Sequence, residues 1–418
     1  MMKLSEELAW RGFVNQTTFD DIKKLDGQQW TFYHGFDASA DSLTIGNLAG
    51  VMVDKVFMRH GCKAIILAGG ATSLIGDPGG KDSERPMQDE ETIARNVAGV
   101  AKQLEKVLAG YDFTLVNNLD WTKDMSVIAF LRDIGKHFSM TPLVQRDFIA
   151  RRMGAGGAGI SYTEFSYTLL QGMDFLHLFD NYGATLEVGS SDQWTNCISG
   201  IELIRRARNA EAQVFTHPLV VNKTTGKKFG KSEAGAVWLD PARTTPTQFY
   251  QFWITADDEG VEEYIKVYTE LDKPAVDSIM EEHRKDPKKR YAQRRLAEAA
   301  TKLIHGEQHA KAAEDVTMLL TGEVSLDKFS SIELMLDVLR KEIPAIGSSA
   351  DGSIIDALVE TGLAASNTEA RRFLKENAVS VNGQKVQRET FEPDDFAGGR
   401  LLLRRGKAFK DSALVELG

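Results

Sequence analysis

The stretch Trp30-Thr31-Phe32-Tyr33-His34-Gly35-Phe36-Asp37 decides the fold, because it predicts a strand that ends in a loop. A helix is expected to start near Thr44-Ile45-Gly46-Asn47-Leu48 and to run to about His60. Residues 63–68 are nearly continuously apolar, which is typical of a strand buried on both faces of a parallel sheet. Strand, helix and strand in this order predict the beginning of a doubly wound α/β fold.

The same alternation continues to about residue 235, which predicts a Rossmann-like doubly wound parallel sheet. Residues 125–182 are too long for a simple crossover and are interpreted as a mainly helical insertion. Their glycine cluster, residues 154–159, is expected to be a surface loop, because no strand precedes it as a phosphate-binding loop requires. The other expected elements are two short helices within 1–29, a helix over 91–108, and strands over 113–117, 185–189 and 215–221.

Beyond residue 247 the expected structure is wholly helical, and it then changes again near the C-terminus. Residues 347–353 have the composition of a linker, and the Asn382-Gly383 pair that follows predicts a β-hairpin. We therefore predict three domains. They are a sheet domain over 1–235, an α-helical domain over 236–346, and a linker with a small α+β domain over 347–418.

Composition narrows the class of protein. The chain has 418 residues and a formal net charge of -10, which argues against a protein coated in nucleic acid but allows a local basic face. No apolar run approaches the length of a membrane span, and the N-terminus lacks the apolar core of a signal peptide. The two cysteines, Cys62 and Cys197, have no metal-ligand spacing around them. We expect a cytoplasmic, reduced protein with no metal site and no membrane contact.

The segment from Tyr33 to Asn47 is the first candidate site. Ligands of open parallel sheets bind beyond the carboxyl ends of the strands, and the N-terminus of a helix suits an anion such as a triphosphate. Asp37, Ser39 and Asp41 could bond an ammonium, a ribose or a phosphate. The alternative is that they form only a turn and a helix cap.

The segment Lys228-Phe229-Gly230-Lys231-Ser232 is the second candidate. Two ammonium groups on either side of a glycine could follow the charge that develops on a departing pyrophosphate. The alternative is a solvated lysine loop without a ligand.

A polar stripe on an otherwise apolar helix is the third candidate. Tyr167, Gln171 and Asp174 have the i, i+4 and i+7 spacing that places them on one helix face. Buried polar groups need partners, which either a small polar ligand or a polar core network would supply. Two loops at strand ends, 189–194 and Gly76-Asp77-Pro78, face the same crevice or are ordinary capped turns.

Together these segments resemble the tyrosyl-tRNA synthetases of the bacterial and organellar type, which are class I aminoacyl-tRNA synthetases. The resemblance covers nearly the whole chain, with the motifs in the family's order and spacing. It implies that Tyr33 and Asp174 hold the phenolic hydroxyl of tyrosine, one as donor and one as acceptor. For the rest of the amino acid it implies Tyr167, Gln171 and Asp77 at the α-ammonium group, Gln193 in the pocket wall, and Asn118 as support behind it.

For ATP the resemblance implies a substrate that binds with Mg²⁺ and no tightly bound cofactor. Asp37 and Asp192 would contact the adenylate, and adenine would pack at Gly46. The implied ATP-binding residues are Gly35, Asp37, Gly46, Asn47, Asp192 and Lys231, and the implied catalytic residues are Lys228, Lys231, Ser39 and Thr44.

The resemblance also implies partners. The helical domain would lie on the anticodon side of tRNA(Tyr), and residues 352–418 are similar to an S4-type RNA-binding domain, with Arg371, Arg372 and Lys375 on its helical face. A homodimer is implied, in which one tRNA contacts both subunits, and the apolar helices of the insertion could form its interface.

One signature departs from the family pattern. Where the family usually has His-Ile-Gly-His, this chain has Thr44-Ile45-Gly46-Asn47. Asn47 can donate a hydrogen bond as a neutral imidazole does, but Thr44 is shorter than histidine. Losing one hydrogen bond of the transition state costs roughly 2.7–4 kcal/mol, which His34 could partly offset.

The leading hypothesis is a tyrosine–tRNA ligase. Preference for tyrosine over phenylalanine, a known property of this family, requires buried groups that lose their partner when the hydroxyl is missing. The Tyr33 and Asp174 pair therefore disfavours specificity for tryptophan. The alternative is an RNA-binding synthetase paralogue with reduced or lost aminoacylation, which Thr44 keeps open.

Overall fold

The computed structural model describes residues 2–77, 87–145, 147–154, 156–227, 229–232, 235–324, 326, 333–406 and 411–418. Its contacts divide the chain into two compact units. The first contains residues 1–243 and 256–292, and the second contains residues 244–255 and 293–418. This division into two units groups residues 256–292 with the sheet domain, and it does not test the three domain boundaries expected from the sequence. Those boundaries stay a prediction.

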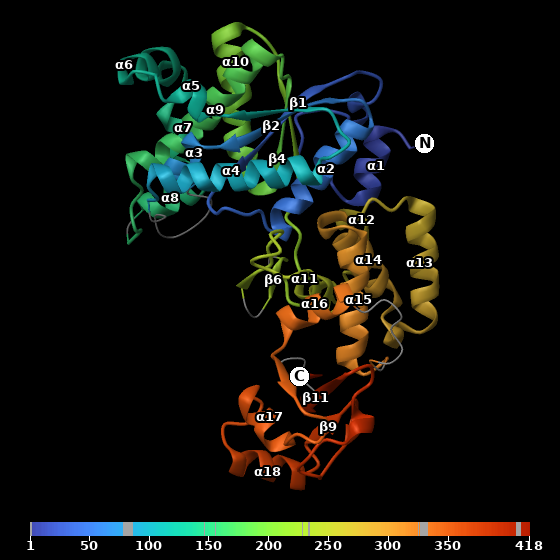
Figure 1. The fold of residues 1–418 in the computed structure, drawn as a ribbon. Coiled ribbons are helices and arrows are strands. Elements are labelled where there is room, and N and C mark those ends of the chain that lie inside the picture. Colours follow the sequence, from blue (N-terminus) through green and yellow to red (C-terminus); the bar gives the residue numbers. More distant parts are fainter. Residues whose placement is uncertain are drawn as a thin grey trace. The chain divides into compact units, whose positions relative to one another are not determined.

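A parallel sheet of five strands forms the centre of the first unit, in the order β3-β2-β1-β4-β5, which confirms the predicted fold class. The chain builds outward from β1 to β3 and then returns to the other side of β1 with β4 (Figure 1). The last strand ends earlier than expected, because Pro218 has no N–H to donate to a ladder. The strands are β1 Thr31–Asp37, β2 Lys63–Gly69, β3 Phe113–Asn117, β4 Leu186–Ser190 and β5 Gln213–His217.

Helices cover both faces of this sheet (Figure 1). Successive side chains of β1 alternate between the faces, so Tyr33 packs against Phe175 of α9 while His34 meets Asp54 of α2. The second short helix expected near the N-terminus is only a 3₁₀ turn, Ile22–Leu25. The helices are α1 Leu4–Arg11, α2 Ile45–Arg59, α3 Ala71–Ile75, α4 Glu90–Val107, α9 Tyr162–Tyr182 and α10 Trp194–Arg208.

The insertion between β3 and β4 is helical, as expected, but it is broken into short pieces before α9. The described part of the glycine cluster, 154 and 156–159, is an exposed turn without regular structure. Arg152 and Glu164 form two hydrogen bonds of 2.7 Å in a buried position and join the end of α8 to the first turn of α9. The pieces are α5 Leu119–Thr122, α6 Val127–Ala129, a π-helical turn Phe130–Ile134, a 3₁₀ turn Gly135–His137, α7 Met140–Val144 and α8 Asp147–Met153.

Two further helices complete the first unit, α12 Val261–Tyr268 and α13 Lys273–Lys285, beside the short strands β6 Lys231–Ser232 and β7 Gly235–Ala236. The buried guanidinium of Arg11 donates to the carbonyl oxygens of Lys266 and Thr269 at 2.7 and 2.9 Å. These carbonyls lie at the end of α12, so one side chain of α1 satisfies them and fixes the two helices together.

The second unit combines helices with a mixed sheet of order β10-β9-β11-β12-β8. The predicted hairpin is confirmed, with Asn382 and Gly383 both at positive φ (48° and 84°) between β9 and β10. The expected linker begins inside strand β8, because residues 345–348 pair in parallel with β12. The elements are α11 Pro246–Ile254, α14 Tyr291–His305, α15 Glu307–Thr321, α16 Glu333–Glu342, β8 Ala345–Ser348, α17 Ile354–Glu360, α18 Asn367–Lys375, β9 Val379–Val381, β10 Gln384–Lys385, β11 Arg400–Arg405 and β12 Ser412–Leu417.

Among the described residues, no helix combines the length and the apolar character that crossing a membrane requires.

Candidate active site

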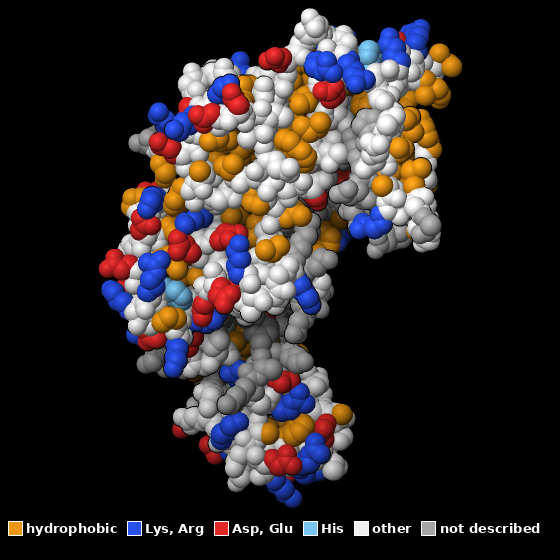
Figure 2. Space-filling view, turned by 180° about the vertical axis from the view of Figure 1, so that it is seen from behind, with side chains coloured by type: hydrophobic (Ala, Val, Ile, Leu, Met, Phe, Trp, Pro, Cys, Tyr) orange, Lys and Arg blue, Asp and Glu red, His pale blue; other side chains and the backbone are white. Residues whose placement is uncertain are grey.

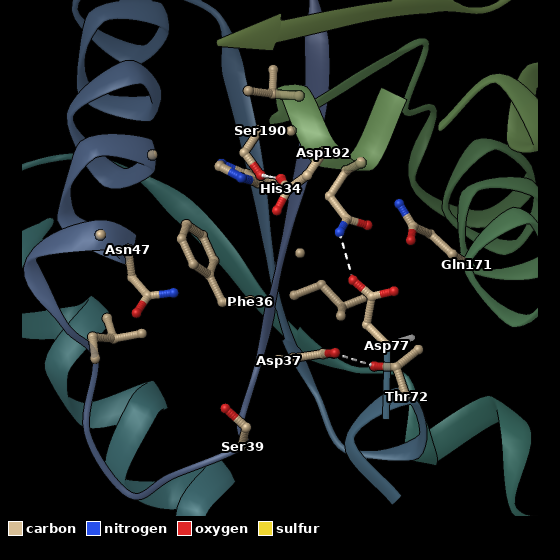
Figure 3. A pocket seen from close by; sticks show the side chains of 18 of the residues that line it. His34, Phe36, Asp37, Ser39, Asn47, Thr72, Asp77, Gln171, Ser190 and Asp192 are labelled. Carbon is tan, nitrogen blue, oxygen red and sulfur yellow. Dashed lines mark hydrogen bonds between the residues drawn. The ribbon is translucent and has the colours of Figure 1, made fainter. Parts of the chain in front are cut away.

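A pocket of about 380 Å³ opens where β1 and β4 end, at the point where the order of the strands reverses (Figure 3). Ligands of doubly wound sheets bind at this kind of position. Residues expected at both ends of the site line it together: Tyr33, Gly35, Asp37, Ser39, Thr44, Gly46, Asn47, Asp77, Tyr167, Gln171, Asp174, Asp192 and Gln193. Asp41 does not line it and pairs with Arg243 instead.

Asp174 is held at the deep end of the pocket by two donors. Asn118 Nδ2 donates to its Oδ2 and Trp121 Nε1 to its Oδ1, each at 2.9 Å. Burial raises the pKa of Asp174 to about 7, although both hydrogen bonds lower it, and the charges of Asp37 and Glu187 raise it further. Asn118 lies behind the pocket, as expected. Trp121 was not expected there, because only the folded arrangement brings the turn after β3 next to Asp174.

Tyr33 lies beside Asp174 in the same apolar wall and is 2% exposed. Its hydroxyl has no hydrogen-bond partner among the described residues. Burial and the nearby carboxylate of Glu187 raise the pKa of Tyr33 well above its ordinary value, so the hydroxyl keeps its proton and remains a donor.

A second polar group connects three elements around Asp37. The Tyr167 hydroxyl donates to Asp37 Oδ2 at 2.8 Å, and Thr72 Oγ1 donates to Oδ1 at 2.7 Å. Gly69 makes this approach possible, because a Cβ at that position would lie 2.4 Å from Thr72 Oγ1 and 2.6 Å from Asp37 Oδ1. Asp37 therefore also faces the amino-acid half of the pocket, beyond the adenylate contact expected for it.

Asp77 and Gln193 meet across the pocket, with Gln193 Nε2 donating to Asp77 Oδ2 at 2.7 Å (Figure 3). Gln171 lies beside them, and its Nε2 donates to Glu187 Oε1 at 2.9 Å. Three acidic or amide side chains thus converge where a cation would be held. Glu187 was not expected in the site, and its signal in the sequence was a lone acid inside the strand Leu186-Glu187-Val188.

The first turn of α2 forms the other end of the pocket. There the Thr44 hydroxyl donates a hydrogen bond to Oδ1 of Asn47 at 2.8 Å. Figure 3 shows the amide nitrogen of Asn47 directed toward the pocket. The N-terminal N–H groups of a helix at this position favour an anion. Asp192 lies nearby at the end of β4 and accepts a hydrogen bond from Ser190.

The lysine segment is described only in part. Lys228 lies outside the described residues, and of Lys231 only the backbone in β6 is described. Between them, the buried ring of Phe229 stacks on Tyr264 of α12 with 4.2 Å between ring centroids. Gly230, at φ 95°, lies against the start of α2, where its Cβ position would be 3.4 Å from the backbone nitrogen of Gly46. The backbone between the two lysines therefore borders the end of the pocket that α2 forms.

His34 and Asp54 form a buried pair beside the pocket that was not predicted from the sequence. Nδ1 of His34 lies 2.9 Å from Oδ1 of Asp54, whose side chain is fully buried on α2. Burial raises the pKa of Asp54 and lowers that of the neighbouring His217 to about 4. The lone aspartate within the apolar run of α2 was the available signal.

The expected RNA-binding residues lie on α18, in the second unit. Arg371, Arg372 and Lys375 are exposed. Arg371 lies 3.5 Å from the exposed Glu389, and Arg372 lies 3.3 Å from the half-buried Glu369. Such exposed pairs contribute little and exchange readily for phosphate contacts. In the described part of the chain, no group of three or more His, Cys, Asp or Glu residues is arranged to hold a metal ion.

Comparison with known proteins finds relatives that match this chain over its whole length. A family model described as "tRNA synthetases class I (W and Y)" matches residues 25–320, and one described as "Tyrosine--tRNA ligase SYY-like C-terminal domain" matches residues 335–410. The chain is 41% identical to Tyrosine--tRNA ligase 2 of Bacillus cereus over 429 aligned positions, which covers 100% of both chains. It is 41% identical to the Tyrosine--tRNA ligase of Roseiflexus castenholzii, over 97% of this chain and 98% of that one.

Solved structures are similar in the same way. A C-terminally truncated mitochondrial tyrosyl-tRNA synthetase of Aspergillus nidulans matches with a TM-score of 0.69 and 29% identity, over 77% of this chain and 94% of that chain. The tyrosyl-tRNA synthetase of Archaeoglobus fulgidus, complexed with L-tyrosine, matches with a TM-score of 0.54 and 14% identity, over 74% and 99% of the two chains, which shows the fold alone.

Proposed function

The chain belongs to the tyrosyl-tRNA synthetases and is a tyrosine–tRNA ligase, and from this premise we propose how its residues carry out the reaction. The single observation that carries the proposal is the pairing, in one buried wall, of the unpartnered Tyr33 hydroxyl with the doubly hydrogen-bonded carboxylate of Asp174. A phenolic hydroxyl that accepts from Tyr33 and donates to Asp174 satisfies both. Phenylalanine would leave the Tyr33 hydroxyl without an acceptor and would bring no donor to the remaining lone pairs of Asp174.

The α-ammonium group of tyrosine binds among Asp77, Tyr167 and Gln171. Asp77 brings a carboxylate, and Gln171 brings an amide oxygen because its nitrogen is occupied by Glu187. Gln193 orients Asp77 through its 2.7 Å hydrogen bond, and Asn118 supports Asp174 from behind. These bonds exist without the substrate, so the amino-acid end of the pocket is largely organised before tyrosine arrives.

ATP binds at the start of α2 and at the end of β4. Mg²⁺ would arrive with ATP and would neutralise part of the charge of its phosphate groups. Asn47 donates through Nδ2, Asp192 bonds the ribose, and the small residues Gly35 and Gly46 leave room for the nucleotide. Asp37 lies between the two substrates. It accepts a hydrogen bond from Tyr167 of the tyrosine site and lines the pocket together with Ser39 of the ATP site.

The first half-reaction needs no nucleophilic side chain. The tyrosine carboxylate attacks the α-phosphorus of ATP, the bond to the bridging oxygen breaks, and pyrophosphate leaves with the electron pair. Lys228 and Lys231 stabilise the charge on pyrophosphate, and Ser39 and Thr44 of the pocket wall contribute to the same step. In the second half-reaction a terminal ribose hydroxyl of tRNA(Tyr) attacks the carbonyl carbon and releases AMP. Arg371, Arg372 and Lys375 contact the phosphates of that tRNA.

Tyrosine-dependent exchange of pyrophosphate into ATP tests the first half-reaction. We expect exchange with tyrosine and almost none with phenylalanine at equal concentration. Charging of tRNA(Tyr) by the same preparation tests the second. Exchange without charging would favour the RNA-binding paralogue, and the assembled pocket gives that alternative no support.

A homodimer is part of the proposal. Val127, Ile128 and Leu131 are 72%, 70% and 48% exposed around α6, and Figure 2 shows apolar side chains gathered at that end of the molecule. Exposed apolar clusters of this kind mark interfaces. Light scattering after gel filtration should give twice the mass of the chain, and Ile128→Glu should give the mass of one. A cytoplasmic location is proposed because Cys62 and Cys197 are both unpaired.

A further inference from the structure

Glu187 is a buried acid in the pocket wall that the mechanism above uses only through Gln171. It lies on β4, is 2% exposed, and stands beside Tyr33 of β1 in the strand register. Side chains at neighbouring register positions of parallel strands project from the same face. Glu187 and Tyr33 therefore point together toward α9 and α10.

The two carboxyl oxygens of Glu187 have different surroundings. Oε1 accepts from Gln171 Nε2 at 2.9 Å. Oε2 is buried without a hydrogen-bond partner among the described residues, and so is the Tyr33 hydroxyl next to it. Gly200 of α10 lies against this carboxyl group and against Phe175, because a Cβ there would be 3.3 Å from Oε2 and 2.8 Å from the Phe175 ring.

Among the described residues, the groups that act most strongly on this acid include no lysine and no arginine. Its neighbours are Tyr33 and His34 on β1, Cys197 on α10 and Gln171 on α9, with the like charge of Asp174 also near. Burial raises the pKa of Glu187, while its polar neighbours Tyr33, Gln171 and Cys197 lower it. A buried carboxyl group without a cation is cheaper to hold as the neutral acid.

We propose that Glu187 is a specificity-determining positioning residue that acts as a neutral acid. Its Oε2–H donates to the oxygen of Tyr33, and its Oε1 accepts from Gln171. The Tyr33 hydroxyl is then turned toward the substrate as a donor, and the Gln171 amide oxygen is turned toward the α-ammonium group. One residue thereby sets the hydrogen-bond direction at both ends of the bound tyrosine.

The direction of each bond follows from counting donors. The chain of bonds runs from Glu187 to Tyr33, from Tyr33 to the substrate oxygen, and from the substrate hydroxyl to Asp174. An ionised Glu187 would instead accept the Tyr33 proton, and the Tyr33 oxygen and Asp174 would then be two acceptors for the single proton of the substrate hydroxyl. Figure 3 shows the amide oxygen of Gln171 on the side of Asp77, as the scheme requires.

Two substitutions of similar size test this inference, which rests on the proposed tyrosine site. Glu187→Met keeps the length of the side chain but removes both oxygens, so Tyr33 and Gln171 lose their orientation. We expect its KM for tyrosine in pyrophosphate exchange to rise about tenfold or more, with an unchanged KM for ATP. Glu187→Gln donates from Nε2 and accepts at Oε1, as the neutral acid does, and should restore the KM for tyrosine to within about twofold of the native value.

A spectroscopic measurement checks the protonation directly and does not depend on activity. The infrared difference spectrum of native protein minus Glu187→Gln at pH 8 should contain the C=O stretching band of a protonated carboxylic acid, since Asp174 is present in both proteins and cancels. A carboxylate band in its place, or a loss of tyrosine affinity in Glu187→Gln as large as in Glu187→Met, would overturn the inference. Absence of exchange by the native protein would instead overturn the proposed function.

Discussion

The hydroxyl of Thr44 lies 2.8 Å from Oδ1 of Asn47, and the backbone N–H of Thr44 donates to the same oxygen at 3.0 Å. One amide oxygen thus receives both donors of Thr44, and the amide nitrogen of Asn47 is left facing the pocket. The two residues that depart from the family signature work as a pair. We propose that Thr44 acts by orienting Asn47, whereas the family resemblance placed it among the implied catalytic residues.

Removal of the Thr44 hydroxyl should therefore lower activity through Asn47. We expect Thr44→Ala to reduce kcat for pyrophosphate exchange by about fivefold to tenfold, because the amide loses one of the two bonds that orient it. Thr44→Ser keeps the hydroxyl and should stay close to the native rate. Equal rates for both variants at saturating tyrosine would show that this bond does not matter.

Asp174 should control both affinity and selectivity for tyrosine. Asp174→Ala removes the acceptor of the phenolic hydroxyl and leaves Asn118 and Trp121 with unused donors. We expect the KM for tyrosine to rise by about 10- to 100-fold and the preference over phenylalanine to fall by a similar factor. Asp124→Ala, an exposed aspartate of the same domain, is the matched control and should change neither value. Unchanged selectivity in Asp174→Ala would refute the pocket assignment.

The pKa of Asp174, about 7, predicts how tyrosine binding depends on pH. The ionised form accepts the phenolic proton, so the KM for tyrosine should fall as pH rises from 6 to 8, with up to about tenfold per unit below the pKa. Asp174→Asn should bind more weakly but with a flat profile over this range. The stability of the ligand-free protein should depend on pH in the opposite direction, because it should decrease as the pH rises. The folded state holds this proton more tightly than the unfolded state, so the contribution of Asp174 lowers the free energy of unfolding as pH rises from about 4 to about 7.

Gly69 should tolerate no side chain. A methyl group there would lie 2.4 Å from Thr72 Oγ1 and 2.6 Å from Asp37 Oδ1, so Gly69→Ala must break the hydrogen bond between them. We expect the KM for tyrosine to rise. Overpacking should also lower the free energy of unfolding by about 1–3 kcal/mol and the melting temperature by several degrees. Gly347→Ala, where nothing lies within 4 Å of the added atom, serves as the control. A native-like KM in Gly69→Ala would mean that Asp37 and Thr72 need not stay bonded.

The sequence predicted the elements of the sheet domain well, because buried parallel strands are apolar runs with clear ends. It also predicted the Tyr167, Gln171 and Asp174 stripe, since helical spacing is local. The contact of Trp121 with Asp174 and that of Gln171 with Glu187 could not be predicted in this way. Both depend on which strands become neighbours, and strand order is not encoded in any short window. The same reason explains strand β8, whose Gly and Ser residues look like a linker until β12 pairs with them.

The ring of Phe229 stacked on Tyr264 has a consequence for the timing of catalysis. Any outward swing of the segment between Lys228 and Lys231 would have to pull this ring out of an aromatic stack. Movement of that backbone is therefore coupled to α12 and carries an activation barrier. We infer that the escape of pyrophosphate from the end of the pocket that this segment borders is a stage at which the enzyme can be slowed without any change in how tightly it holds tyrosine.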